Sequence, residues 1–362
     1  MQYQKRSINL AVNCRFLSQT LTGAQRAAVE LCKQIKRLEP STVFLSPGNI
    51  LHKELAETLG VKTIGKLTGH LWEQFDLPRF LKKHGKPVLL NLCNMAPLSY
   101  RSNVITIHDL SPLRSPSWFS YVFRTYYKRM LPVIARKALK VFTDSAFSKR
   151  EISELLSVPE AGVTVIHLAV PENILQLADR NFPNENGKYI LAVSSIDPRK
   201  NFSRLAKAFL RLKLHDTKLI LVGGKNAVFS DAKLGSILHE AENIVFAGYI
   251  DDVELVALYR NALCLAYPSL YEGFGLPPLE AMACKCPVVV SETASLPEVC
   301  ADAAYYVDPY NVDSIAEGIY KVATDDQLRK TLIEKGAKRV TAFSWEKSAQ
   351  KLLESIKQAN DS

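Results

Sequence analysis

Two short stretches in the second half of the chain place cations and glycines where predicted strands end. In Ser194–Asn201, Arg199 and Lys200 stand side by side after a predicted strand and before a predicted helix. A guanidinium offers a planar fork of donors and an ammonium a point charge, and both neutralise phosphate groups. Gly224, which closes Leu221–Gly224 after the next predicted strand, lets the backbone approach a ligand closely. Together they predict a diphosphate site, although an Arg-Lys pair alone is more typical of a solvated surface.

A third stretch, Tyr267–Ala283, predicts an anion site at the start of a helix. A loop with Gly273, Phe274 and Gly275 follows a buried strand. The helix begins near Leu276, because proline is tolerated in a first helical turn. The N–H groups of a first turn have no partner within the helix and face an anion with a favourable dipole.

Two carboxylates flank this loop at different depths. Glu272 lies on the loop, and Glu280 lies about one turn inside the helix. Because a carboxylate repels a phosphate, we expect both to accept hydrogen bonds from sugar and ribose hydroxyls. The alternative is a turn stiffened by proline, with a buried glutamate whose hydrogen bonds are satisfied by the protein.

His108 is the one histidine whose position suggests a function. It follows a buried predicted strand, so it stands at the edge of the sheet where ligands bind. The alternative is a structural histidine–aspartate pair, and the adjacent Asp109 could instead cap the next turn. The other histidines have no metal-ligand spacing, and no second pair completes a zinc site with Cys284 and Cys286. We therefore expect no metal, and reduced cysteines that pack in the interior.

The pattern of the whole chain predicts an α/β fold with two domains. Short apolar runs alternate with helical stretches, which is typical of a parallel sheet. In the first half, strands are expected at 8–13, 42–45, 87–92, 104–107, 140–143 and 163–166, with long helices at 119–139 and 147–156. In the second half, strands are expected at 189–193, 219–222, 244–247, 262–266, 287–290 and 304–307, with helices at 201–213, 252–260, 276–285, 311–323 and 326–340. A polar, turn-rich segment at 179–187 predicts the linker between domains 1–178 and 188–342.

Composition is that of a globular chain with an uneven charge. The 362 residues are 47% hydrophobic and carry a net charge of +10. Residues 1–180 hold 25 basic and 13 acidic side chains, whereas residues 181–362 hold 21 and 23. A basic half can face anionic lipid, nucleic acid or a phosphate-bearing substrate. No apolar run is long enough for a spanning helix, so we expect a mature intracellular protein.

Aromatic and basic residues alternate in the stretch 118–129, and further cations follow up to Lys140. One interpretation is a helix on an anionic membrane surface. The other is an amphipathic core helix whose aromatics face the sheet. No recognised nucleic-acid module accompanies the stretch, so nucleic-acid binding is disfavoured.

Several motifs in their order along the chain resemble glycosyltransferase family 4, the retaining group 1 transferases. The likeness is strong in the second half and covers nearly the whole chain. The motifs are Asp197–Asn201, Leu221–Gly224, Phe246–Tyr249, Pro268–Ala283, Leu296–Glu298 and Phe343–Trp345. In the first half, four stretches look like bacterial polysaccharide-assembly members: Thr22–Arg26, His70–Gln74, Ile107–Leu110 and Thr143–Ser148.

The resemblance implies a GT-B fold: two Rossmann-like domains with a cleft between them. The acceptor would bind mainly to the first domain and the donor nucleotide sugar mainly to the second, and a C-terminal helix at 343–362 would cross back. Arg199 and Lys200 would bind the donor diphosphate, Glu280 the ribose, and Glu272 the transferred sugar. The backbone from Gly273 through Leu276, with Phe274 and Gly275, would line the sugar and phosphates.

The first domain would add two contacts. Gly23 would let the first loop approach the diphosphate, and His108 would reach the reacting side of the sugar. The chain departs from the family at Ile166–Pro171, which lacks the glycine that often follows the last strand of this domain, and it has one glycine in the first loop where some members have two. The family needs no metal, and the chain has no Asp-x-Asp triplet.

The implied function is retaining transfer of a hexose from a nucleotide diphosphate sugar to a saccharide acceptor that is lipid-linked. The likeness of the first domain to bacterial polysaccharide-assembly members favours GDP-mannose as the donor, with UDP- and dTDP-sugars as alternatives. It also implies a role in O-antigen, capsule or exopolysaccharide biosynthesis. We expect a cytoplasmic protein, peripheral on the inner face of the membrane, without a cofactor. Two other functions fit the same fold: a sugar-nucleotide epimerase and a non-enzymatic nucleotide-sugar-binding adaptor. A Rossmann dehydrogenase is disfavoured, because neither half has Gly-x-Gly-x-x-Gly after its first strand.

Overall fold

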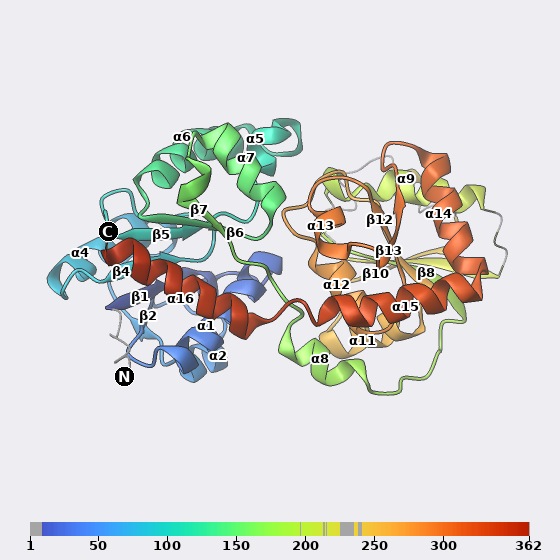
Figure 1. Ribbon diagram of the computed structural model, residues 1–362, viewed down its shortest axis with the longest axis horizontal. Coiled ribbons are helices and arrows are strands. Elements are labelled where there is room, and N and C mark those ends of the chain that lie inside the picture. Colours follow the sequence, from blue (N-terminus) through green and yellow to red (C-terminus); the bar gives the residue numbers. More distant parts are fainter. Residues whose placement is uncertain are drawn as a thin grey trace. The chain divides into compact units, whose positions relative to one another are not determined.

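The computed structural model describes residues 9–195, 197–212, 214, 216–224, 235–237 and 241–361. They form two compact units, each built around its own sheet (Figure 1). Unit 1 comprises Met1–Leu168 and Ser344–Ser362, and unit 2 comprises Ala169–Phe343. The predicted α/β class with two doubly wound domains is confirmed.

Unit 1 contains a seven-stranded sheet in the order β3-β2-β1-β4-β5-β6-β7, in which all neighbours are parallel. Its strands are β1 (Leu10–Asn13), β2 (Val43–Ser46), β3 (Lys62–Thr63), β4 (Val88–Asn91), β5 (Asn103–Thr106), β6 (Lys140–Thr143) and β7 (Val163–Val165). The order reverses at β1, which pairs with β2 on one side and β4 on the other. Open α/β sheets bind ligands at such a point, outside the carboxyl ends of the strands.

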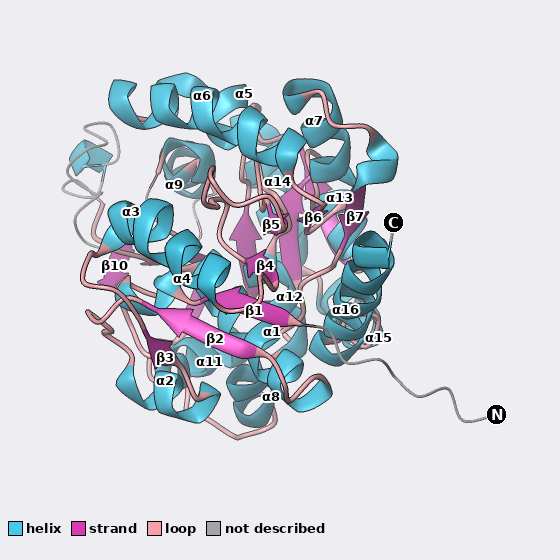
Figure 2. Cartoon of the chain, turned by 90° about the vertical axis from the view of Figure 1, so that its left-hand side faces the viewer, coloured by secondary structure: helices cyan, strands magenta, loops and turns pink. Residues whose placement is uncertain are grey.

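Helices cover both faces of this sheet. They are α1 (Gly23–Leu38), α2 (Lys53–Leu59), α3 (Gly69–Leu71), α4 (Leu77–Lys83), α5 (Ser111–Arg114), α6 (Tyr121–Lys137), α7 (Ala146–Leu156) and α16 (Trp345–Asp361). In Figure 1, α5, α6 and α7 lie on one side of the sheet and α1, α2 and α16 on the other. Figure 2 shows α3 and α4 beside β1, β2 and β4.

The core of unit 1 forms because its strands are apolar on both faces, as parallel strands between helices must be. One cluster packs Ala11 and Leu89 against Trp72, which is fully buried between α3 and α4. A second cluster packs Ile105 against Leu131 of α6. The helices are therefore held to the sheet by buried apolar area rather than by surface charges.

Unit 2 contains a six-stranded parallel sheet in the order β10-β9-β8-β11-β12-β13. Its strands are β8 (Lys188–Val193), β9 (Thr217–Val222), β10 (Ile244–Gly248), β11 (Cys264–Tyr267), β12 (Val288–Ser291) and β13 (Ala304–Val307). The order reverses at β8, which pairs with β9 and with β11. The gap between the carboxyl ends of β8 and β11 is therefore the switch point of this unit.

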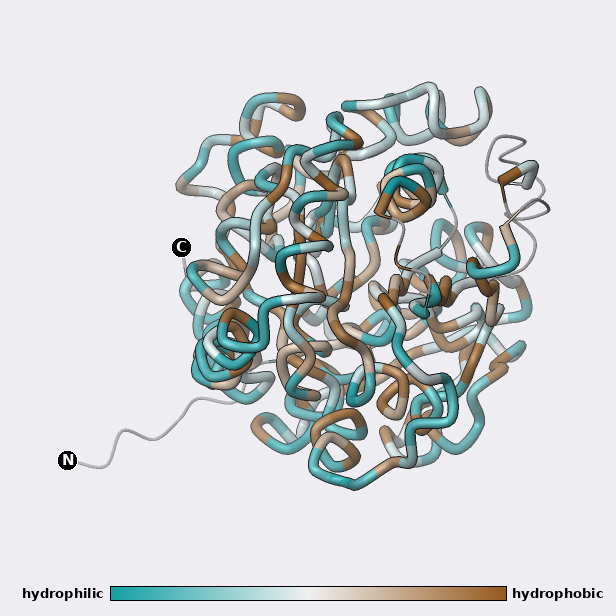
Figure 3. The backbone as a smooth tube through the Cα atoms, turned by 90° about the vertical axis from the view of Figure 1, so that its right-hand side faces the viewer, coloured by the Kyte–Doolittle hydropathy of each residue, from teal (hydrophilic) through white to brown (hydrophobic). Residues whose placement is uncertain are grey.

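The helices of unit 2 form two groups around its sheet. They are α8 (Glu172–Ala178), α9 (Phe202–Arg211), α11 (Asp252–Asn261), α12 (Leu276–Ala283), α13 (Leu296–Cys300), α14 (Val312–Thr324) and α15 (Asp326–Val340). Helices α9 and α14 pack together, and α8 and α12 pack beside each other. In the view of Figure 3, hydrophobic segments run through the interior and hydrophilic ones along the outer turns.

The boundary between unit 1 and unit 2 lies earlier in the sequence than the predicted linker at 179–187. Residues 169–178, which we assigned to the first domain, belong to unit 2. The reason is that α8 packs against α11 and α12, with Ile174 fully buried and the Asn173 amide donating to the Asp252 carboxylate. Helix α16 belongs to unit 1, where it packs against α1 and Glu346 pairs with Arg37 at 3.0 Å.

Each expected strand and helix has a counterpart among the described residues, with ends that differ by a few positions. Ile8 and Lys213, at the ends of two expected elements, lie outside the described residues. Strand β3 was not predicted, because it is two residues long and both side chains are exposed. All seven cysteines are free thiols, six of them buried. None of the described helices is both long and apolar enough to cross a membrane.

Candidate functional site

A short 3₁₀ turn, Pro198–Lys200, carries two cations to the end of β8. The Asp197 carboxylate accepts a hydrogen bond from the Arg199 backbone N–H at 3.1 Å and so caps the turn. Asn201 then adopts a left-handed conformation with φ of 63°, which ends the turn and starts α9. This backbone leaves the Arg199 side chain partly exposed and buries Lys200, which is 7% exposed.

The turn is tied to the loop that follows β11. The Leu270 N–H donates to the Arg199 carbonyl oxygen at 2.7 Å, and the Asn201 amide donates to the Pro268 carbonyl oxygen at 2.9 Å. Two stretches some 70 residues apart in the sequence thus lie side by side at the switch point of unit 2. The strand order explains this, since β8 and β11 are neighbours in the sheet.

Lys200 and Glu272 form a buried ion pair across this junction. The Lys200 Nζ lies 2.6 Å from Oε1 of Glu272 and donates to the Tyr267 hydroxyl at 3.0 Å. Both charged side chains are less than 10% exposed. Burial alone would raise the pKa of Glu272, but the charges of Lys200 and Arg199 outweigh it and hold that pKa below its usual range. The Glu272 carboxylate is therefore ionised at neutral pH.

The geometry of this buried ion pair decides whether it stabilises the fold. Desolvating two charges is costly, and their mutual attraction offsets that cost only when the geometry is good. The Lys200 ammonium has three donors and uses two of them on Glu272 and Tyr267. Among the described residues it has no third acceptor, so one N–H could serve an acceptor such as a phosphate oxygen.

The loop between β11 and α12 has a backbone that only glycine fits at one position. Gly275 has a φ of +111°, and a Cβ at this position would lie 2.6 Å from Cδ2 of Leu296. The Ser295 hydroxyl lies 3.0 Å from the Glu272 carbonyl oxygen and 2.7 Å from that of Phe274. Helix α12 then begins at Leu276, as predicted.

The helix start offers fewer donors than most, because two prolines follow Leu276 and have no N–H. Anion binding here would use the backbone of the glycine loop and of Leu276 itself. Phe274 is 4% exposed, and its ring packs edge-on against Phe343 at 5.6 Å between centroids. The loop is thus held from both sides before any ligand binds.

Glu280 lies deeper in α12 and contacts a different helix. It is 6% exposed, and its Oε2 accepts a hydrogen bond from the Tyr259 hydroxyl of α11 at 3.2 Å. Burial, followed by the Glu280 charge, raises the pKa of Tyr259 well above its usual value. The tyrosine thus stays a donor and holds one of the two carboxylate oxygens.

In unit 1, His108 is held by both of its ring nitrogens. Its Nδ1 lies 2.7 Å from Oδ2 of Asp144, and its Nε2 lies 2.8 Å from the Leu92 carbonyl oxygen. Since a carbonyl oxygen only accepts, Nε2 carries a proton, and Nδ1 shares one with Asp144. Burial opposes the charged ring, but the Asp144 carboxylate outweighs it and raises the pKa of His108 well above its usual value. The ring can present charge to a ligand but no unoccupied nitrogen.

The aspartate in this pair is Asp144 rather than the neighbouring residue. Asp109 instead accepts hydrogen bonds from the Ser111 N–H at 3.0 Å and hydroxyl at 2.7 Å, in the turn that leads into α5. Asp144 follows β6, next to β5 in the sheet, so the pair forms between the ends of adjacent strands. Sequence alone could not find it, because 36 residues separate the two.

A second polar cluster occupies the switch point of unit 1. Glu73 is 1% exposed, and its Oε1 accepts hydrogen bonds from the Asn13 amide at 2.8 Å and from Nε of Arg15 at 3.2 Å. Its Oε2 lies 3.3 Å from Nδ1 of His70, whose side chain is half exposed. Burial acts to raise the pKa of Glu73, but the His70 hydrogen bond and the Arg15 charge lower it below its usual value. We had not singled out Arg15 or Glu73 as site residues.

We expect Glu73→Gln to lower the free energy of unfolding of the protein by about 3 kcal/mol, because it leaves the buried Arg15 guanidinium without a countercharge. Urea denaturation followed by circular dichroism measures the loss. Glu57→Gln is the matched control, since Glu57 lies exposed on α2 of the same unit. Equal midpoints for the two variants would show that the Glu73 cluster is not a buried charge network.

Gly23 and Gly224 occupy positions that do not require glycine in the isolated unit. A Cβ at either one would have no heavy atom within 4 Å, and neither has a positive φ. Gly23 opens α1, where Thr22 and Gln25 form a capping box. Neither position therefore shows a structural need for glycine among the described residues. Among the described residues, no group of three His, Cys, Asp or Glu side chains is arranged to hold a metal ion.

Each unit is built on a parallel sheet with polar residues at its switch point. Two such units make up the fold of the GT-B glycosyltransferases. A glycosyltransferase from Rickettsia africae superposes with a TM-score of 0.73 at 20% identity, covering 99% of each chain. Residues 175–339 match the family described as glycosyl transferases group 1.

Two curated relatives support the same assignment. The O-antigen chain mannosyltransferase B of Escherichia coli is 32% identical over 267 residues, which cover 70% of each chain. The serotype-specific mannosyltransferase WbdA of Escherichia coli is 30% identical over 273 residues, 69% of this chain but 33% of that protein. This chain belongs to the group 1 glycosyltransferases, and it is an enzyme of the glycosyltransferase class.

Proposed function

We propose that the chain is a retaining hexosyltransferase of family 4 that transfers mannose from GDP-mannose to a lipid-linked saccharide in the biosynthesis of a cell-surface polysaccharide. The names of the mannosyltransferase relatives support the sugar and the process. The observation that carries the proposal is the buried Lys200–Glu272 pair at the switch point of unit 2. UDP- and dTDP-sugars are the alternative donors.

The donor diphosphate lies, in this proposal, against the Arg199 guanidinium and the Lys200 ammonium. The backbone from Gly273 to Leu276 lines the phosphates and sugar, and Glu272 accepts a hydrogen bond from a hydroxyl of the transferred hexose. Glu280, whose Oε2 accepts a hydrogen bond from Tyr259, accepts hydrogen bonds from the ribose hydroxyls. Gly224 allows the nucleotide to approach the end of β9 closely.

The reaction breaks the bond between the anomeric carbon and the diphosphate oxygen and forms a bond from that carbon to an acceptor oxygen. Negative charge develops on the leaving diphosphate, where Lys200 and Arg199 stabilise it. The acceptor hydroxyl attacks the face that the diphosphate leaves, and the diphosphate takes its proton, so the configuration is retained. No cofactor takes part.

We expect donor binding to weaken on the alkaline side at a lower pH than an ordinary lysine would give, whose pKa is about 10.4. Burial lowers the pKa of Lys200, although Glu272 opposes the shift. Raising the pH therefore neutralises the cation that holds the diphosphate. Calorimetric titration with GDP from neutral to alkaline pH measures this. A Kd that stays constant up to the ordinary lysine range would contradict it.

Transfer itself is tested by incubating the protein with anomerically labelled GDP-mannose and a saccharide primer bearing a lipid diphosphate. Nuclear magnetic resonance of the product shows whether the configuration at the anomeric carbon is retained. Product with inverted configuration would overturn the mechanism. Donor binding without turnover would favour the adaptor, and conversion of the donor sugar without acceptor would favour the epimerase. The acceptor would place the enzyme at the cytoplasmic face of a membrane.

A further inference from the structure

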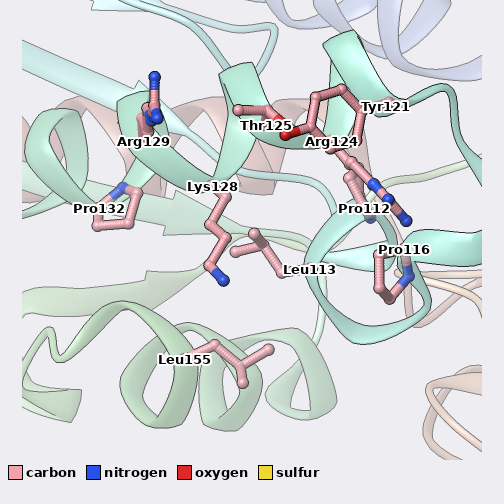
Figure 4. A pocket seen from close by; sticks show the side chains of 10 residues that line it. All are labelled: Pro112, Leu113, Pro116, Tyr121, Arg124, Thr125, Lys128, Arg129, Pro132 and Leu155. Carbon is pink, nitrogen blue, oxygen red and sulfur yellow. The ribbon is translucent and has the colours of Figure 1, made fainter.

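Unit 1 has a groove of about 880 Å³ between α6 on one side and α5 and α7 on the other. Its α6 wall carries Arg124, Lys128 and Arg129, and the facing wall is formed by Pro112, Leu113 and Leu155 (Figure 4). Figure 4 shows Lys128 extending from α6 toward Leu155. A volume of this size suits a ligand of many atoms rather than a single ion.

Two of the three cations of the groove share one face of the helix. Arg124 and Lys128 are four residues apart, which places them one above the other on α6. Arg124 lies over the ring of Tyr121 at 5.2 Å. In the part of the chain that the structure describes, neither Lys128 nor Arg129 forms an ion pair. The positive charge of this face is therefore available to a ligand.

The nearby carboxylates do not cancel that charge. Glu151 and Glu154 of α7 flank the groove wall, but Arg114 of α5 binds both, at 2.9 Å and 3.6 Å. Arg114 thus offsets one of the two carboxylate charges on α7, and the two cations Arg124 and Lys128 outnumber the single negative charge that remains. An anionic ligand meets attraction from α6 without equal repulsion from α7.

Exposed apolar side chains adjoin the cations at the start of α6. Tyr121 is 71% exposed, Val122 77% and Phe123 40%. Further along the helix, Leu131 and Ile134 are buried in the core of the unit. The amphipathic core helix that we considered from the sequence is therefore present, and its first turn carries an additional apolar surface. Such a surface next to cations is typical of helices that lie at a membrane interface.

We propose that this groove binds the terminal phosphate of a membrane lipid. The phosphate contacts Arg124 and Lys128, and the first part of the hydrocarbon chain lies against Leu113 and Leu155. Val122 and Phe123 lie in the interfacial region of the bilayer. The cations provide charge complementarity, and the exposed apolar turn favours a lipid over a free sugar phosphate, which has no apolar part to cover it. The further idea that this lipid carries the acceptor rests on the proposed function, whereas the binding does not.

The test is co-sedimentation of the full chain with phosphatidylcholine vesicles that contain a polyprenyl phosphate. Vesicles with phosphatidylglycerol at the same total charge are the comparison, because this lipid has no terminal phosphate. We expect tighter binding to the polyprenyl phosphate vesicles. The double variant Arg124→Ala/Lys128→Ala should weaken it roughly 30-fold, since each cation near a membrane surface contributes about fivefold.

The matched control is Arg136→Ala/Lys137→Ala, which removes the same charge from exposed positions of the same helix outside the groove. It should bind polyprenyl phosphate vesicles as the unchanged chain does. Equal losses in the two double variants, or equal binding to both vesicle types, would show that binding depends on general surface charge rather than on the groove. Either result would overturn the proposal. Displacement from the vesicles by inorganic diphosphate would assign the site to a small anion instead of a lipid.

Donor binding in the same Arg124→Ala/Lys128→Ala protein separates the two proposals. A GDP-induced rise in melting temperature that persists shows that the variant is folded and unit 2 intact. Lipid binding without donor binding would support the lipid site in the groove and contradict the transferase proposal. Donor binding and transfer without lipid binding would support the transferase proposal and contradict the lipid site.

Discussion

Lys200→Met is expected to lower kcat/KM for transfer roughly 10³-fold. The variant removes the charge that neutralises the leaving diphosphate while keeping an unbranched side chain in the buried site. It also leaves the Glu272 carboxylate without the ammonium 2.6 Å away, so the protein should lose about 3 kcal/mol of stability. Initial rates of nucleoside diphosphate release with donor and acceptor measure the first effect, and urea denaturation the second.

Two further variants separate function from stability. Lys200→Met/Glu272→Gln leaves no unpaired charge, so stability should recover while transfer does not. Lys207→Met makes the same change at an exposed position of α9 and should behave like the unchanged chain. Near-normal turnover of a folded Lys200→Met protein would remove this residue from the site.

Gly275→Ala is expected to cost about 3 kcal/mol of stability and to abolish donor binding. The backbone has a φ of +111°, which L residues rarely adopt, and the new Cβ would lie 2.6 Å from Leu296. The loop must shift to relieve this contact, and the Glu272 and Phe274 carbonyls held by Ser295 shift with it. Thermal denaturation and titration with GDP measure the two losses.

The Leu296→Ala background tests the cause of this loss. Removing the leucine side chain makes space for the new Cβ, so Gly275→Ala should cost less there than in the unchanged protein. Gly48→Ala serves as the control for glycine replacement, because a Cβ at Gly48 has no atom within 4 Å. Equal costs of Gly275→Ala in both backgrounds would attribute the whole effect to backbone strain.

The elements of this fold could be predicted from sequence because their periodicity is strong. The run of valines in the buried strand Val288–Ser291 and the apolar face of the amphipathic helix Val312–Thr324 are both visible in the local sequence. The domain boundary could not be predicted, since the polar stretch 179–187 has the composition of a linker but lies after the point where the second unit begins. What decides the boundary is the packing of α8 on α11 and α12, and even the nearer of these, α11, lies about 80 residues away in the sequence.

In the candidate site, too, sequence predicts individual residues but not the contacts between them. Lys200, Glu272 and Gly275 stand out by residue type and by their places after strands. Their pairing depends on β8 and β11 being neighbours, which the sequence does not show. The partners that hold them are ordinary residues: Tyr267 ends a strand, and Ser295 precedes a short helix. The Asp144 partner of His108 and the Arg15–Glu73 cluster were missed for the same reason, because long-range contacts leave no local pattern.

The most direct measurement is a thermal-shift comparison of the full chain and Lys200→Met with GDP, UDP, dTDP and GDP-mannose, without divalent metal. A ligand at one hundred times its Kd adds about 2.7 kcal/mol to the folded state, which corresponds to a rise of roughly 5–10 °C for a unit of this size. We expect one nucleoside diphosphate and its sugar to raise the melting temperature of the unchanged chain and to leave that of Lys200→Met unchanged. No shift with any of the four ligands, or an equal shift in the variant, would contradict a diphosphate site at Lys200.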